Sequence, residues 1–244
     1  MFYPIILVLM VAAYGIYSLP EVKGLIGEVV VKLALLFLPD NQYIIMNDIY
    51  IPAYDGLYTQ IDHLIVAACG VIVIETKNYS GKLTGNSRKK YWMAYKDGEY
   101  YKAYNPIRQN SYHIKMLKDN CPGIKGEKIY SIICLSFGVK ANIETRTPII
   151  GPLGLRKTIT AFNRNSSKHP SKINLIAKMI SEITIDKKTA SVRHRRMLAL
   201  RKERFRKGIC PRCNAKLLRK RGVKGEYLIC SNYPVCKFRA SNAV

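Results

Sequence analysis

The amino-acid sequence predicts a mixed α/β or α+β core with a mixed sheet, followed by a small module near the end of the chain. Three observations lead to this fold class. Apolar residues repeat with helical spacing over residues 21–37, three β-rich runs follow between residues 43 and 76, and four cysteines lie close together after residue 209. Globular domains usually contain about 100 to 200 residues, so 244 residues leave room for one such core and a satellite.

The first twenty residues are apolar, and no charged side chain occurs before Glu21. A helix of this length is about long enough to cross ~30 Å of hydrocarbon. We therefore expect a membrane anchor over residues 1–20. A buried helix and a signal peptide are the alternatives, but signal peptides normally carry basic residues before the apolar run and a small-x-small cleavage site after it. Lys23, Lys32 and the basic sequence beyond them indicate a single-pass protein of the inner (cytoplasmic) membrane, N-terminus outside and the rest cytoplasmic.

The core is predicted to begin with a helix over residues 21–37, which Pro39 and Asp40 end. Helical spacing places one stripe of apolar residues on a single face of this helix. These residues are Leu25, Val29, Val30, Leu33 and Leu36.

Strands are predicted next. Residues 43–51, 61–67 and 70–76 are β-rich and separated by short connections, which indicates an antiparallel meander. Residues 92–95 indicate a further strand. Turn residues surround another short strand before it: Gly81, Gly85 and Asn86.

A second helix is predicted to open at Asn105-Pro106 and to run to about residue 119, before a buried strand over residues 128–137. Residues 172–183 indicate an amphipathic helix, and residues 187–207 a basic helix or tether. We divide the chain into an anchor, a core domain, a helical and basic linker, and a terminal module: residues 1–20, 21–150, 151–207 and 208–241.

The charge is strongly positive and uneven. Forty lysines and arginines against 16 acidic residues give a net charge of +24, which attracts phosphate polymers or anionic lipid more readily than acidic proteins. From Lys187 to Arg239, 18 basic residues face only Glu203 and Glu226. We therefore expect the C-terminal fifth of the chain to attract nucleic acid most strongly.

The cysteines are spaced for a metal. Cys210-x2-Cys213 and Cys230-x5-Cys236 form two knuckles whose four thiolates can surround one tetrahedral Zn²⁺. Four sulfurs complete the coordination shell, so this zinc is expected to be structural and to supply much of the folding free energy of so small a module. The other cysteines lie apart in apolar surroundings, which indicates a reducing compartment.

Two acidic residues and a lysine are predicted to converge. The runs 61–67 and 70–76 are joined by a tight connection, so their hairpin brings Asp62 opposite the region of Glu75, and strand alternation gives Glu75 and Lys77 one face. Two carboxylates suit Mg²⁺ or Mn²⁺, which activates water against a phosphodiester. Lys77 would then orient that water or offset developing charge. A salt bridge between Lys77 and either acid is the alternative.

The segments Gly27-Glu28, TQIDHLIV, VIVIETKNYSGKLTG and NPIRQNSYH resemble the nuclease-related domain, a branch of the PD-(D/E)xK nuclease superfamily. The resemblance extends over about residues 24–137. It implies a restriction-endonuclease-like core and a Mg²⁺-dependent nuclease. It also implies an active site of three acidic residues and a lysine, with an auxiliary glutamine. These residues are Glu28, Asp62, Glu75, Lys77 and Gln109.

The segments CPRC and LLRKRGVKGEYLICSNYPVCKF resemble the C-terminal zinc ribbon of bacterial type IA topoisomerases. This resemblance implies single-stranded or distorted DNA as the ligand. The local chemistry agrees, because basic side chains can meet phosphates and aromatic ones can stack on bases. The expected contacts are Arg219, Lys220, Arg221, Lys224 and Tyr233. For Tyr227 and Phe238 two roles stay open: stacking on bases, or packing in the small core of the ribbon.

Two histidines have structural interpretations. His63 points away from Asp62 on its strand and is expected to make a structural hydrogen bond. His113, one turn after Gln109, is expected to pack or to contact phosphate. The sequence thus predicts a membrane-anchored DNA nuclease. The alternatives are an inactive nucleic-acid-binding protein that keeps the nuclease fold as a scaffold, and a basic tail that mainly recognises anionic lipid.

Overall fold

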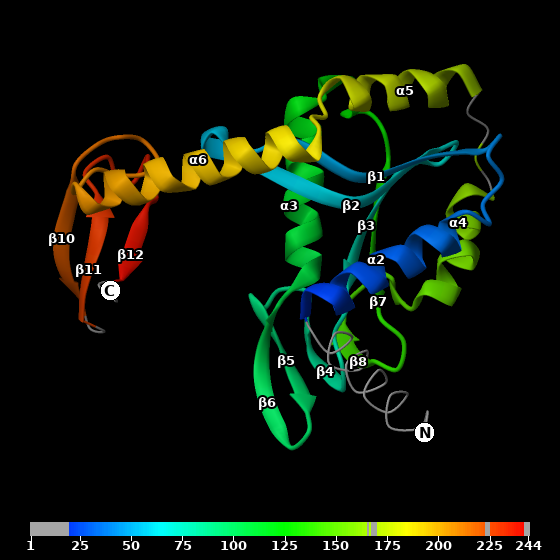
Figure 1. Cartoon of the computed structure of the whole chain (residues 1–244), viewed down its shortest axis with the longest axis horizontal. Coiled ribbons are helices and arrows are strands. Elements are labelled where there is room, and N and C mark those ends of the chain that lie inside the picture. The colour runs from blue at the N-terminus through cyan, green and yellow to red at the C-terminus, as the bar shows by residue number, and fades with distance from the viewer. Residues whose placement is uncertain (1–19, 165, 167–169, 223–224, 242–244) are drawn as a thin grey trace, which may run out of the picture. The chain divides into compact units, whose positions relative to one another are not determined.

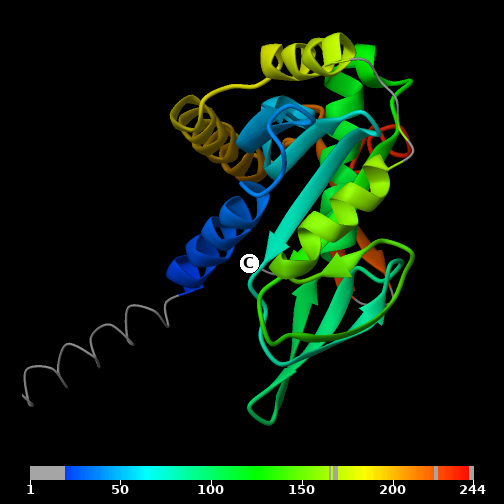
Figure 2. The ribbon, with the colours of Figure 1, turned by 90° about the vertical axis from the view of Figure 1, so that its right-hand side faces the viewer.

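A computed structural model describes residues 20–164, 166, 170–222 and 225–241 (Figures 1 and 2). The anchor predicted over residues 1–20 lies outside the described residues apart from Pro20, and so does Lys224. Contacts divide the chain into two compact units: residues 59–184 with the chain up to Ile51, and residues 52–58 with the chain after Thr184. Within the described ranges, no helix is both long and apolar enough to cross a membrane.

Helix α2, Pro20–Leu35, is the first element of the first unit. It packs on the central strands through Val31 and Leu35, which are buried with Ile72 and Ile74. The apolar stripe that helical spacing singles out faces solvent instead, because Val29, Leu33 and Leu36 are exposed. Apolar residues surround much of this helix, so spacing alone does not decide which side meets the sheet.

A five-stranded mixed sheet carries the core, in the order β1-β2-β3-β7-β9. Strands β2 and β3 are antiparallel, whereas β7 runs parallel to β3 and β9 runs parallel to β7. The predicted α+β class with a mixed sheet is therefore confirmed. The strands are β1 Tyr43–Pro52, β2 Tyr58–Ala67, β3 Gly70–Lys77, β7 Ile129–Leu135 and β9 Ile149–Ile150.

A four-stranded sheet follows in the same unit, in the order β6-β5-β4-β8. One of its faces is buried through Trp92, Leu83 and Ala94, which cluster with residues of β7. The sequence predicted β4 and β5, but it gave no signal that identified β6 or β8. The bounds are β4 Lys82–Asn86, β5 Tyr91–Lys96, β6 Glu99–Tyr104 and β8 Lys140–Glu144.

Helices cover both faces of the central sheet. Helix α3, Pro106–Asn120, begins where predicted, because the Asn105 side chain accepts a hydrogen bond from the Ile107 amide at 2.9 Å. Helix α4, Leu155–Asn163, was not predicted from the sequence and packs in the cluster that contains α2. Helix α5, Pro170–Glu182, confirms the predicted amphipathic helix.

The second unit contains the basic helix and the cysteine module. Helix α6, Lys187–Arg206, confirms the predicted basic helix and is capped by Asp186, whose carboxylate accepts from the Thr189 amide at 2.8 Å. Three antiparallel strands follow: β10 Leu217–Gly222, β11 Gly225–Cys230 and β12 Arg239–Ser241.

Candidate active site and zinc ribbon

Asp62 and Glu75 lie where the ladder between β2 and β3 ends. The antiparallel ladder runs from Ala67 opposite Gly70 to His63 opposite Ile74, so Asp62 and Glu75 form the next pair in register. The Thr76 amide donates a 2.9 Å hydrogen bond to Asp62 Oδ2. The predicted convergence of the two carboxylates is therefore present in the structure.

Glu75 lies between two cationic or polar partners. Its side chain is only 1% exposed, with Lys77 Nζ 2.6 Å from Oε1 and His113 Nε2 3.1 Å from Oε2. Oε1 is buried and, among the described residues, makes no hydrogen bond of regular geometry in spite of the nearby ammonium. Each carboxylate oxygen has two lone pairs, so Oε1 can accept a cation beside the Lys77 ammonium.

Helix α3 places His113 against Glu75. Asn110 fixes the helix on the sheet, because its side-chain amide donates to the Val73 carbonyl at 2.9 Å and to Ser131 Oγ at 2.8 Å. One turn along, the other ring nitrogen of His113 lies 2.7 Å from Thr59 Oγ1. His113 thus joins Thr59 to Glu75.

Sequence reasoning assigned His113 to packing or to phosphate and missed its contact with Glu75. The available signal was its spacing of four residues from Gln109 on the same helix. Gln109 itself is half-buried, one turn before His113.

The surroundings of Asp62 disfavour its charged form. Burial first, and then the negative charge of Glu75, raise the pKa of Asp62 to about 7, with Glu28 adding to the effect. The Thr76 amide and Lys77 act in the opposite direction. Glu28 on α2 is therefore within electrostatic reach of the pair, and the site holds more negative than positive charge.

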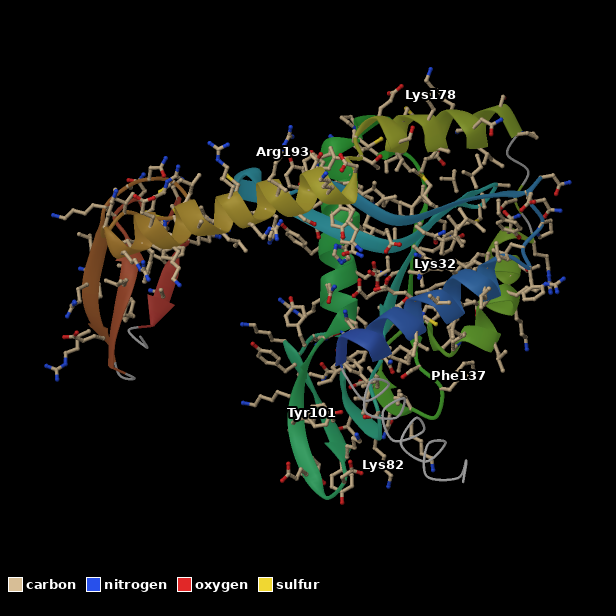
Figure 3. All side chains as sticks on the ribbon, in the orientation of Figure 1. Lys32, Lys82, Tyr101, Phe137, Lys178 and Arg193 are labelled. Atoms are coloured by element: carbon tan, nitrogen blue, oxygen red, sulfur yellow. The ribbon has the colours of Figure 1, made fainter. Side chains whose placement is uncertain are left out.

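A polar group on β1 borders these acids. Asp48 forms an ion pair with Lys32 of α2, the residue labelled on that helix in Figure 3. Gln60 Nε2 donates to Asp48 Oδ1 at 3.3 Å. Burial, followed by Asp48, Glu28 and Asp62, raises the pKa of Tyr50. Asp48 and Tyr50 were not singled out from the sequence, because their contacts arise only when β1 lies beside β2.

His63 has the structural role expected of it. It is buried, its Nδ1 lies 2.7 Å from Asn47 Oδ1, and burial lowers its pKa to about 4. A neutral imidazole in this position holds β1 against β2.

The carboxylates fit a hard divalent cation. Mg²⁺ and Mn²⁺ prefer oxygen ligands, and Asp62 and Glu75 supply carboxylate oxygens where Glu28 adds a third negative charge. The raised pKa of Asp62 reports negative charge that the described residues do not fully neutralise. A cation would supply that neutralisation.

The four cysteines gather at one point of the second unit. Their sulfur atoms all lie within 4.8 Å of one another, with Sγ of Cys210 and Cys236 at 3.7 Å and Sγ of Cys213 and Cys230 at 3.2 Å. Zinc–sulfur bonds of about 2.3 Å in a tetrahedron require sulfurs roughly 3.8 Å apart. The set fits structural zinc.

Comparison with known proteins matches both parts of the chain. Residues 23–136 match the family described as the nuclease-related domain, and residues 207–242 match the topoisomerase DNA-binding C4 zinc finger. The chain carries a nuclease-related domain and a topoisomerase-type zinc ribbon.

Two relatives show how far these similarities extend. An uncharacterized protein of Bacillus anthracis is 35% identical over 99 residues, which cover 41% of this chain and 47% of that protein. DNA topoisomerase 1 of Methanocaldococcus jannaschii is 60% identical over 30 residues, which cover 12% of this chain and 4% of the topoisomerase. The chain thus spans about half or less of each of these relatives. No solved structure matches it.

The zinc ribbon presents basic and aromatic side chains beside its cysteines. On β10, Arg219, Lys220 and Arg221 are exposed, and Arg219 pairs with Glu226 at 3.2 Å. The Arg239 guanidinium lies 5.2 Å from the ring centroids of both Tyr227 and Tyr233. Phe238 packs on the cysteine cluster and against Phe205, with ring centroids 6.2 Å apart, so its role is in the core.

Proposed function

We propose that this protein is a membrane-anchored, metal-dependent nuclease that hydrolyses DNA phosphodiester bonds and binds DNA through its zinc ribbon. The observation that carries the proposal is the convergence of Asp62, Glu75 and Lys77 where the ladder between β2 and β3 ends, inside a domain that matches the nuclease-related family. The raised pKa of Asp62 adds support, because perturbed acids gather at catalytic sites.

Asp62 and Glu75 would hold Mg²⁺ or Mn²⁺, and Glu28 would strengthen the negative field. When bound, such an ion supplies a Lewis acid for the phosphodiester and lowers the pKa of a coordinated water. Lys77 keeps its ammonium beside Glu75, where it can orient the attacking water or offset the charge that develops on phosphate oxygens.

The neighbouring residues of helix α3 would position Glu75 and the substrate rather than supply charge. His113 holds Oε2 of Glu75, while Lys77 lies beside Oε1. Gln109, one turn away, is the candidate for holding a phosphate or a water by hydrogen bonds.

DNA binding is assigned to the ribbon and the basic sequence around it. Arg219, Lys220 and Arg221, with Lys224 outside the described residues, would contact phosphates, and Tyr233 would stack on a base. Stacking requires an exposed base face, so we propose single-stranded or distorted DNA as the favoured ligand. The apolar residues 1–20 would anchor the chain in the inner membrane, with both domains in the cytoplasm.

The test replaces Glu75 with Gln, which keeps the side-chain volume and removes a charged ligand. DNA cleavage in Mg²⁺ should fall by roughly 100-fold or more, whereas DNA affinity should stay equal or rise slightly because repulsion of phosphate decreases. The matched control is Glu182→Gln on the exposed side of α5, which should cleave as wild type does. Mg²⁺ should be omitted rather than chelated in the metal-free arm, because a chelator also removes zinc from the ribbon.

A binding protein that uses the nuclease fold as a scaffold is the second candidate. The double engagement of Glu75 by Lys77 and His113 favours it, since these partners satisfy much of the carboxylate without a cation. Equal cleavage by wild type and Glu75→Gln would assign any activity to a contaminant or another site and would leave this candidate as the better one.

A further inference from the structure

The four-stranded sheet of the nuclease-related domain has one buried and one open face. Strand side chains alternate, and the register pairs Tyr91 with Tyr104 and Tyr95 with Tyr100 on β5 and β6. Trp92 and Ala94 point to the opposite face, where both are fully buried. The tyrosine pairs therefore lie on the outer side of the sheet.

These tyrosines are unusually accessible for large aromatic residues. Tyr100 is 71% exposed, and Tyr91, Tyr95 and Tyr104 are each more than a third exposed. The rings of Tyr95 and Tyr100 are 4.8 Å apart, and those of Tyr91 and Tyr104 are 6.1 Å apart. The two pairs are four residues apart along β5, or about 13 Å at the usual rise of a strand.

Lysines share this outer face. Lys102 stands opposite Met93, Lys82 stands opposite Tyr95, and Lys140 stands opposite Lys82. At the far end of the same face, Glu144 is the acidic residue opposite Asn86. In the described part of the chain, the ion pairs involve none of these three lysines. The open face thus combines aromatic rings with positive charge.

Cross-strand pairing of aromatic residues stabilises a hairpin on its own. That role gives no reason for three lysines on the same face. Exposed aromatic residues with interleaved cations are instead the combination that binds single-stranded nucleic acid, since ring faces stack on bases and lysines meet phosphates.

The hairpin of β5 and β6 is also tied to the candidate active site. Tyr79, two residues after Lys77, donates from its hydroxyl to the Tyr104 carbonyl at 2.9 Å, and Tyr101 donates to the Ser80 carbonyl at 3.3 Å. Burial and then Glu75 raise the pKa of Tyr79. Lys82 and Tyr101 mark this sheet in Figure 3. The segment after Lys77 thus connects the acids to the hairpin of β5 and β6.

We propose that the outer face of the sheet β6-β5-β4-β8 binds single-stranded DNA, with bases stacked on the pairs Tyr95–Tyr100 and Tyr91–Tyr104 and phosphates held by Lys82, Lys102 and Lys140. A duplex does not fit this surface as well, because its base faces are covered by their neighbours in the stack. The choice of DNA over RNA rests on the function proposed above.

The test uses the full chain with zinc and with Glu75→Gln, so that binding is measured without cleavage. The double variant Tyr95→Val, Tyr100→Val removes both rings and keeps strand propensity, and Tyr95→Phe, Tyr100→Phe is the matched control. Affinities are measured for a thymidine strand and for an abasic strand of equal length. The Val variant should bind the thymidine strand roughly fivefold more weakly or worse, with little change for the abasic strand, and the Phe variant should match its parent.

Two further measurements locate the site and guard against a folding defect. Replacing Lys82, Lys102 and Lys140 by Gln should reduce the dependence of log affinity on log salt by up to about three units, without touching the aromatic pairs. Photocrosslinks from iodouracil-labelled DNA should map to residues 91–104 as well as to the ribbon.

The proposal is overturned if the Val and Lys variants bind the thymidine strand as their parent does, or if only an RNA strand crosslinks to residues 91–104. Failure of the nuclease function is distinguishable from this result. In that case wild type does not cleave DNA in Mg²⁺, while crosslinks to the hairpin persist.

Discussion

At the scale of single residues, the raised pKa of Asp62 makes the stability of the folded chain depend on pH. Its pKa is raised from 3.8 to about 7, mainly by burial and by Glu75. Below pH 4 the carboxyl is protonated in both the folded and the unfolded chain. Between pH 4 and 7 the folded chain keeps a proton that the unfolded chain has lost, so stability decreases as pH rises through this window. Above pH 7 the full destabilisation remains.

We predict that Asp62→Asn stabilises the metal-free domain, because the amide keeps an oxygen for the Thr76 amide and has no charge. The gain should be near zero at pH 4 and should reach on the order of 3 kcal/mol at pH 8. Thermal unfolding between these pH values measures it, and Mg²⁺ should narrow the difference by neutralising wild-type Asp62. The control Asp40→Asn, at an exposed position, should show no such trend. A pH-independent difference would contradict the assigned cause.

At the scale of elements, alternation on β10 separates the basic residues of the ribbon. Arg219 and Arg221 share a face with Leu217, which packs on the cysteines, and Arg219 pairs with Glu226. Lys220 points the other way, opposite Tyr227, over which Arg239 lies. The face with Lys220 therefore carries cations and aromatic rings together. On the other face, the ion pair with Glu226 neutralises the charge of Arg219.

We predict that the face with Lys220 and Arg239 makes the larger contribution to DNA binding. Lys220→Gln with Arg239→Gln should lower the slope of log affinity against log salt by up to about two units, roughly one per lost phosphate contact. Arg219→Gln with Arg221→Gln should lower it less, because Arg219 is paired with Glu226 in the free protein. Titrations at several salt concentrations decide between the pairs, and the reverse order would assign binding to the Arg219 face.

At the scale of the whole molecule, the candidate chemistry and most of the net positive charge lie in different units. The acids belong to the first unit, and the basic sequence beyond Lys187 belongs to the second. Loss of one unit's function should leave the other intact.

We predict that the intact chain sediments with membranes after gentle lysis and that a fragment starting at Glu21 does not. The control is the full-length Val8→Arg, Val11→Arg variant, which keeps the length of the segment and places two charges in its apolar run. A charged side chain costs about 2.5–3.5 kcal/mol at the centre of a membrane helix, so this variant should also leave the membrane fraction. Recovery of the wild-type chain in the soluble fraction would rule out the anchor.

Local sequence was sufficient wherever a feature depends on neighbours along the chain. The cysteine spacing predicted the sulfur cluster, Asn105-Pro106 predicted the start of α3, and the tight connection after Ala67 predicted that Asp62 meets Glu75. Each of these depends on short-range backbone geometry, which side-chain type and spacing control directly.

Only the tertiary structure decided which groups meet across the fold. The packed side of α2 is Val31 and Leu35 rather than Leu33 and Leu36, because the shape of the sheet selects between two apolar sides of one helix. His113 reaches Glu75 because Asn110 fixes α3 on β3 and β7, two strands that are more than fifty residues apart in the sequence. Such contacts depend on the summed packing of many distant residues, and no local pattern encodes that sum.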